Sequence, residues 1–211
     1  MAKFTESLDV SIIIDSTLKL LGGALGVKLF DMWLKKRAKK RELIQKDIFI
    51  NNLKEIAVMN HHMTDVIEHT PVDRFLILMG HDSGNIPNPK HPYYAKAMWQ
   101  KVKNEYDDDS LTRKFDSVRV DLDYINMIIE LMIKGCLKIE VDKMPNCFLK
   151  TVYQSEGIKY SELYFLAQEK GHKIYYCSVA TVKDNERFDD ANVRLKIQIA
   201  VDKIRGIFSK L

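Results

Sequence analysis

The sequence has few of the residues that build disulfide-linked or zinc-bound domains. Its 211 residues include only three cysteines, Cys136, Cys147 and Cys177, and no two of them form a C-x-x-C pair. An odd number of cysteines without such a pair fits a reducing compartment and offers no zinc site. We therefore expect three free thiols that are buried as small apolar side chains.

Several enzyme motifs are also missing. The sequence contains no glycine-rich phosphate loop of either usual type, and no serine lies in a G-x-S-x-G context. The densest set of metal-ligand residue types is His61, Asp65 and either Glu68 or His69, which share one helix face but lack the His-Glu-x-x-His order of zinc hydrolases. We interpret this set as solvated surface. We expect no metal site, no catalytic residue and no enzymatic activity, and the sequence names no cofactor.

Positive charge is concentrated in one short run. The net charge is +4, and removing the six positive charges of residues 35–41 leaves −2. The run follows Trp33 and consists, apart from Ala38, of Lys35, Lys36, Arg37, Lys39, Lys40 and Arg41. Such a run attracts lipid phosphate as readily as nucleic-acid phosphate, so its flanking segments must decide between the two.

The preceding segment, residues 11–34, has the length of a membrane-spanning helix. Four charges oppose a span, but Asp15 with Lys19 and Lys28 with Asp31 are spaced to pair on a helix surface. A tryptophan followed by basic residues is typical of a cytoplasmic membrane face. We expect residues 11–34 to span a membrane and residues 33–41 to form its collar. An interfacial or protein-packing helix is the alternative, and a nucleic-acid arm is the least favoured.

Two further features bear on this segment. Gly22 and Gly26 form a G-x-x-x-G pair, through which helices approach one another closely, so we expect them in an oligomer contact. The N-terminus MAKFTESLDV lacks the form of a cleavable signal peptide, so a spanning segment would stay attached. The positive-inside rule then places the rest of the chain in the cytoplasm. The alternative location is a soluble or virion-associated assembly.

The remainder of the chain alternates between helical and strand patterns. Apolar residues at spacings of three and four predict a helix over 41–70, which Pro71 ends. Strand patterns occupy 74–79, 117–121, 137–141, 161–167 and 173–181, and helical patterns occupy 94–102, 123–134, 146–155 and the segment from Asp189 or Asp190 to the C-terminus. A turn signal follows at Asp82–Asn85, and an acidic connection occupies Asp107–Asp109. The pattern predicts an α+β domain.

This order of elements and two local motifs resemble the GAF domain. The first motif is Gly157-Ile158 with Ser161 and Tyr164, which leads through a turn at Gly171 into the strand KIYYCSVAT. The second runs from Arg187 to Leu195 and leads into the last helix. The resemblance implies an antiparallel sheet flanked by helices, with a long N-terminal helix before it. It also implies a sensory domain that binds a small molecule or a protein, without naming the ligand.

The resemblance places a ligand between the middle helix and the sheet. His81 ends the first strand, where it could form a polar pocket mouth, and methionine and aromatic residues could line either a pocket or the core. The candidate ligand-binding residues are His81, Tyr124, Met127, Met144, Tyr164 and Tyr175. A packed core is the other interpretation of the same side chains.

These observations divide the chain into four parts. They are an N-terminal tail (1–10), a membrane or assembly helix (11–34), a basic collar with a connecting helix (35–70) and a GAF-like domain (71–211). The first hypothesis is a membrane-tethered, non-catalytic sensory or binding module. The alternative is a structural or assembly protein, such as one of a virus particle, whose N-terminal helix packs against other copies. We expect membrane lipid and further copies of the chain as partners, allow for a protein partner, and do not expect nucleic acid.

Overall fold

The computed structural model describes residues 10–81, 92–103, 115–169, 173–183 and 188–210, with side-chain surroundings from residue 32 onward. The predicted turn at 82–85, the acidic connection at 107–109, Gly171 and Arg187 lie outside the described residues. The chain divides into two compact units, residues 1–54 and residues 55–211. Each unit is described by itself below.

Helix α1 (Val10–His69) contains no proline, and its apolar residues recur at helical spacing. Thr70 and Pro71 end it: the Thr70 hydroxyl donates to the carbonyl of Val66 (2.6 Å) and accepts from the amide of Val72 (3.2 Å). Every residue from 32 to 54, in the first unit, is exposed. This stretch contains Met32, Trp33, Leu34, Leu43, Ile44, Ile48, Phe49, Ile50 and Leu53.

The second unit is built on an antiparallel sheet. Its six described strands are β1 (Arg74–His81), β2 (Tyr94–Val102), β3 (Val118–Arg119), β4 (Cys136–Glu140), β5 (Tyr160–Glu169) and β6 (Lys173–Thr181), in the order β3-β2-β1-β6-β5-β4. The sheet therefore has β4 at one edge. The described helices after β3 are α3 (Leu122–Lys134), α4 (Phe148–Ser155) and α5 (Ala191–Phe208), together with the short 3₁₀ helix η2 (Val141–Lys143).

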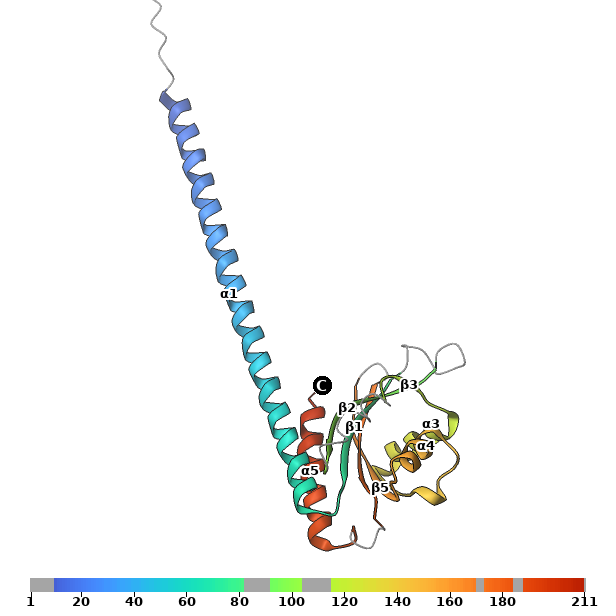
Figure 1. Cartoon of the computed structure of the whole chain (residues 1–211). Coiled ribbons are helices and arrows are strands. Elements are labelled where there is room, and N and C mark those ends of the chain that lie inside the picture. Colours follow the sequence, from blue (N-terminus) through green and yellow to red (C-terminus); the bar gives the residue numbers. More distant parts are fainter. Residues whose placement is uncertain (1–9, 82–91, 104–114, 170–172, 184–187, 211) are drawn as a thin grey trace, which may run out of the picture. The chain divides into compact units, whose positions relative to one another are not determined.

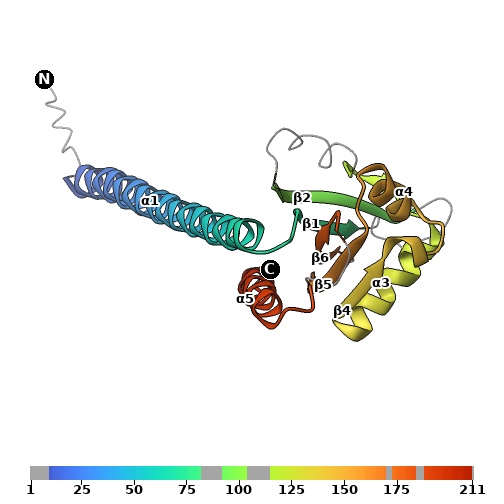
Figure 2. The same cartoon turned by 60° about the horizontal axis from the view of Figure 1, so that its bottom comes forward.

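Helices cover both faces of the sheet (Figures 1 and 2). Alternate residues of a strand point to opposite faces, so β1 sends Leu76 and Leu78 to one face and Phe75 and Ile77 to the other. The first face packs against α3 and α4, and the second against α5 and residues 59–67 of α1. Two hydrophobic cores, one on each face, therefore hold the sheet.

The carboxylate of Asp121 accepts hydrogen bonds from the first turns of two helices. Asp121 accepts hydrogen bonds from the amide of Tyr124 (2.9 Å) in α3 and from the amide of Phe148 (2.7 Å) in α4. The first amides of a helix have no partner within it, so a side-chain acceptor at that place stabilises the helix. Because Asp121 serves both helices, it also fixes α4 beside the start of α3.

The main difference between the predicted and the observed secondary structure lies at β2. The α+β fold with an antiparallel sheet and a long N-terminal helix is confirmed. The helix predicted at 94–102 is wrong, because these residues form β2. Ala95, Ala97 and Met98 favour helices in isolation, but hydrogen bonding to β1 over the length of β2 overrides that preference.

The predicted membrane span is not supported. Among the described residues, none of the helices combines the length and the apolar character needed to cross a bilayer. In residues 11–34 the charges Asp15, Lys19, Lys28 and Asp31 interrupt the apolar run. Gly22 and Gly26 lie in α1, but their side-chain surroundings fall outside the described part, so the predicted oligomer contact stays a prediction.

Replacing Asp121 should destabilise the protein more than replacing an ordinary helix cap. We expect Asp121→Ala to lower the free energy of unfolding by about 2 kcal/mol, since each lost cap costs about 1 kcal/mol. Asp190 caps only α5, by accepting from the amides of Asn192 and Val193, so Asp190→Ala should cost about half as much. Urea unfolding of both variants measures the difference, and equal losses would contradict the double role of Asp121.

Candidate binding groove at the β4 edge

A groove of about 460 Å³ lies along the edge strand β4 in the second unit. Residues of α3, which we call the α3 wall, line it together with residues of β4 and with Lys143, Met144 and Pro145. We call it the β4-edge groove, and it is lined by Asp123, Asn126, Met127, Glu130, Leu137, Lys138, Ile139, Glu140, Lys143, Met144, Pro145, Tyr160 and Asp189.

A tight turn places α3 beside β4. Gly135 follows α3 with φ 76°, a left-handed conformation that costs glycine least, and its amide donates to the carbonyl of Leu131 (2.7 Å). The chain then continues directly into β4, where Leu137 and Ile139 point into the core and Lys138 and Glu140 point to the other face. From β4, the groove therefore receives apolar surface from Leu137 and Ile139 on the α3 face and charge from Lys138 and Glu140 on the other face.

The charges of the groove are unevenly distributed. Lys138 pairs with Asp189 (3.5 Å) and Lys143 pairs with Glu140 (2.6 Å), so both lining lysines have a carboxylate beside them. The α3 wall carries Asp123 and Glu130. Glu130 pairs with Lys134 (2.5 Å), whereas Asp123 forms no ion pair within the described part of the chain. The α3 wall is thus the acidic side of the groove.

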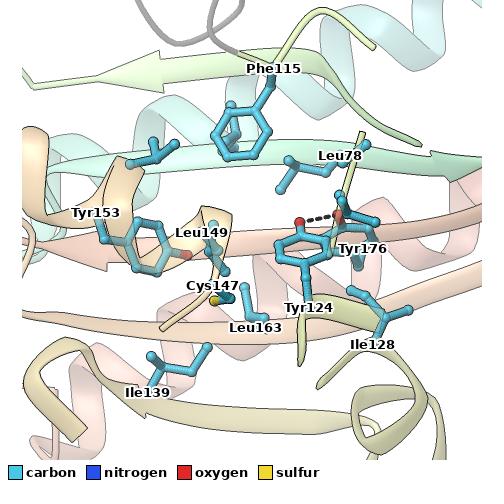
Figure 3. Packing of buried hydrophobic residues seen from close by; sticks show 14 of the residues in the cluster. Leu78, Phe115, Tyr124, Ile128, Ile139, Cys147, Leu149, Tyr153, Leu163 and Tyr176 are labelled. Atoms are coloured by element: carbon cyan, nitrogen blue, oxygen red, sulfur yellow. Dashed lines mark hydrogen bonds between the residues drawn. The ribbon is translucent and has the colours of Figure 1, made fainter. Parts of the chain in front are cut away.

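The space between α3 and the middle of the sheet is filled by a core that contains tyrosines (Figure 3). The hydroxyl groups of Tyr124 and Tyr176 share a hydrogen bond of 2.5 Å, and both side chains are fully buried. The Tyr153 hydroxyl lies 3.0 Å from Ser161 Oγ and 2.8 Å from Ser178 Oγ. Burial raises the pKa of all three tyrosines, so their hydroxyls remain protonated and bonded to one another or to serine.

The opposite face of the sheet holds a buried carboxylate. Glu162 is 2% exposed and accepts a hydrogen bond from Tyr160 (2.8 Å) and another from Tyr164. Burial, and then hydrogen bonding to Glu162, raises the pKa of both tyrosine hydroxyls far above the usual value. Because each carboxylate oxygen has a donor, this cluster is a satisfied part of the second core.

The six predicted ligand residues do not form one pocket. Met127 and Met144 both line the β4-edge groove. Tyr124 is buried in the core on that face. Tyr164 and Tyr175 lie on the other face, where burial and a hydrogen bond to Glu169 raise the pKa of Tyr175 to about 12.

His81 lies apart from these residues, at the end of β1. Its ring stacks on Tyr94 with 5.7 Å between ring centres. The sequence could not separate these residues, since methionine and tyrosine fill cores and line pockets alike. It missed Asp123, Glu130 and Pro145. The signal for the two carboxylates is the polar side of the amphipathic 123–134 segment, and that segment does not include Pro145.

The cysteines and the histidine-rich stretch of α1 are the remaining candidate sites. Cys147 and Cys177 are buried and Cys136 is half-buried, and burial raises the pKa of each thiol. On α1, His69 pairs with Asp65 (3.0 Å). Among the described residues, no three His, Cys, Asp or Glu side chains are placed to hold a metal ion.

Comparisons with known proteins establish the fold. No protein-family model and no curated protein matches the sequence. The GAF domain region of a protein from Geobacter sulfurreducens PCA, described as a membrane protein, is similar in structure, with a TM-score of 0.50 and 12% identity over 76% of this chain and 97% of that chain. The fold is therefore GAF-like.

Two further solved GAF-domain structures, each from a cyanobacterial phytochrome, have a TM-score of 0.44 and 11% identity. The match to the phycocyanobilin-bound domain covers 74% of this chain and 94% of that chain. The match to the phycoerythrobilin-bound domain covers 75% of this chain and 96% of that chain.

Proposed function

We propose that the protein is a non-catalytic binding module whose GAF-like domain holds its ligand, a small molecule or a protein segment, in the β4-edge groove. The groove itself carries this proposal, because it joins an apolar surface from Met127 and Met144 to charged groups within one concave site. Ligand sites are concave and combine apolar walls with a few polar groups in this way.

The surroundings of the cysteines support a binding role over thiol catalysis. A catalytic thiol needs a lowered pKa so that the thiolate can attack. Burial acts in the opposite direction on Cys136, and the nearby charge of Glu162 raises its pKa further. The same holds for burial of Cys147 and Cys177.

Ligand binding in the groove can be observed through the methionine methyl groups. We expect members of a fragment library to shift the methyl NMR signals of Met127 and Met144 in the full-length protein. Met59 and Met63, which lie buried in the core on the other face, are internal controls and should not shift. Met127→Leu and Met144→Leu assign the signals, and a library that leaves both groove methyls unchanged would contradict the proposal.

An assembly role is the second candidate function, and the exposed part of α1 favours it. Leu43, Phe49, Ile50 and Leu53 are all exposed, and on a helix of 3.6 residues per turn they follow one stripe. Burying each such side chain stabilises a contact by about 1.5–3 kcal/mol. A second copy of the chain offers the same stripe, so we propose that copies associate along it.

Charged substitutions should separate this stripe from the rest of α1. Leu43→Asp with Leu53→Asp should weaken self-association more than about tenfold, because two buried contacts are replaced by charges. Ile44→Asp with Ile48→Asp alters two equally exposed residues away from the stripe and should leave association intact. Light scattering coupled to size-exclusion chromatography measures both, and a monomeric parent protein or a reversed order of effects would contradict the stripe.

The basic run supports attachment to an anionic membrane surface without a span. Its residues are exposed, and the Arg37 guanidinium lies 5.1 Å from the ring centre of Trp33. Each lysine or arginine near an anionic bilayer contributes about 1 kcal/mol of attraction. We propose that Trp33 and residues 35–41 hold the protein at the cytoplasmic membrane surface. A soluble or virion-associated assembly is the alternative location, and nucleic acid remains an unfavoured partner.

Vesicle flotation tests this attachment. The full-length protein should float with phosphatidylserine-containing vesicles at low salt, should be released at high salt, and should not bind neutral vesicles. Lys35, Lys39 and Lys40 changed together to Gln should reduce binding, whereas the same change at Lys134, Lys173 and Lys210 should not. Resistance to high salt and carbonate, or an equal loss in both variants, would overturn surface attachment through the run.

A further inference from the structure

The edge strand β4 presents backbone hydrogen-bonding groups to the β4-edge groove. The amide of Phe165 donates to the carbonyl of Gly135 (3.0 Å), and the amide of Val141 donates to the carbonyl of Lys159 (3.0 Å). In an antiparallel pair such bonds occur at every second residue, so odd-numbered residues of this segment bond to β5. The even-numbered residues alternate with them, so Lys138 directs both its amide and its carbonyl away from β5.

No described strand lies beyond β4 on that side. Edge strands with outward-facing amides and carbonyls accept further strands unless something blocks them. Here neither a proline nor an irregular register interrupts β4. The edge residues Leu137–Glu140 line the groove together with residues of α3 and Lys143–Pro145.

The α3 wall specifies what such a strand would carry. Asp123, Met127 and Glu130 follow one another at spacings of four and three, so they stack along one side of α3 as acidic, apolar and acidic positions. Asp123 and Glu130 are separated by about 10 Å along the helix axis. In an extended chain, residues i and i+2 are about 7 Å apart and residues i and i+4 about 13 Å apart, and all three of these side chains share one face. The distance along α3 lies between these two values.

We infer that the β4-edge groove binds an extended peptide segment of a partner protein, which adds to β4 as a further strand and places basic, apolar and basic side chains at alternate positions against α3. This inference rests on the proposed function and names the class of ligand for its groove. Main-chain bonds to Lys138 supply affinity, and alternate side chains supply specificity, as in other cases of strand addition. The excess of carboxylates on the α3 wall selects a basic segment over an acidic one.

The main-chain bond can be removed with little change to the fold. Lys138→Pro deletes the amide that points into the groove, and proline is tolerated at edge positions whose amide faces outward. Lys138→Ala is the matched control, because it deletes the side chain and its pairing with Asp189 but keeps the amide. Weaker peptide binding by the proline variant than by the alanine variant therefore reports strand addition.

Panning phage-displayed random nonapeptides against the full-length protein tests the inference. We expect enriched peptides to carry Lys or Arg at positions i and i+4 with an apolar residue at i+2. Their affinity for Lys138→Pro should be at least about tenfold lower than for Lys138→Ala, which lacks the same side chain, and their affinity should also fall in Asp123→Lys with Glu130→Lys. Enriched peptides without this pattern, or equal affinity for Lys138→Pro and Lys138→Ala, would overturn the inference.

Hydrogen exchange gives an independent readout on the unaltered protein, in case the proline variant does not fold. A bound peptide should slow exchange of the Lys138 amide, whereas the Leu137 and Ile139 amides already bond to β5 and should change little. Unchanged exchange at Lys138 would overturn strand addition. If fragments still shift the methyl signals of Met127 and Met144, the groove binds ligands and only the peptide inference falls. If they do not, the proposed function falls too.

Discussion

Burial of the sheet on both faces is the constraint on which the rest of the second unit depends. The strands β1 and β6 at its centre place large apolar side chains on alternate sides, such as Ile77 toward one face and Leu78 toward the other. Neither face can be left in water, so helices must cover both. The last part of α1 and α5 cover one face, while α3 and α4 cover the other.

The β4-edge groove forms where the helix layer extends past the edge of the sheet. Coverage is complete over the middle of the sheet, where Tyr124 and Tyr176 fill the space between α3 and the strands. At β4 the sheet ends while α3 continues beside it, so apolar and charged side chains meet in a concave surface. The buried Glu162 carboxylate on the other face of the sheet already has hydrogen-bond partners, so it is not available to a ligand in the groove.

Particular elements show how far sequence patterns reach. The strand pattern 173–181 has the observed bounds of β6, because aromatic and β-branched residues dominate it. The pattern begins the last helix at Asp189 or Asp190, and the structure shows that Asp190 caps it. β2 was missed because alanine and methionine favour a helix when considered locally, while its pairing with β1 is a contact between distant parts of the chain. Met127 and Met144 were among the predicted ligand residues, but so were Tyr164 and Tyr175, which the sheet separates from them.

The sequence by itself determined the fold class, the existence of a long N-terminal helix and the single basic run, because these depend on local periodicity, caps and charge. Only the tertiary structure decided which strand stands at the edge of the sheet, which tyrosines fill a core and which residues form a groove. Strand order brings together Asp123, Ile139 and Asp189 from three distant segments. No local pattern encodes such a contact, since it follows from the packing of the whole domain.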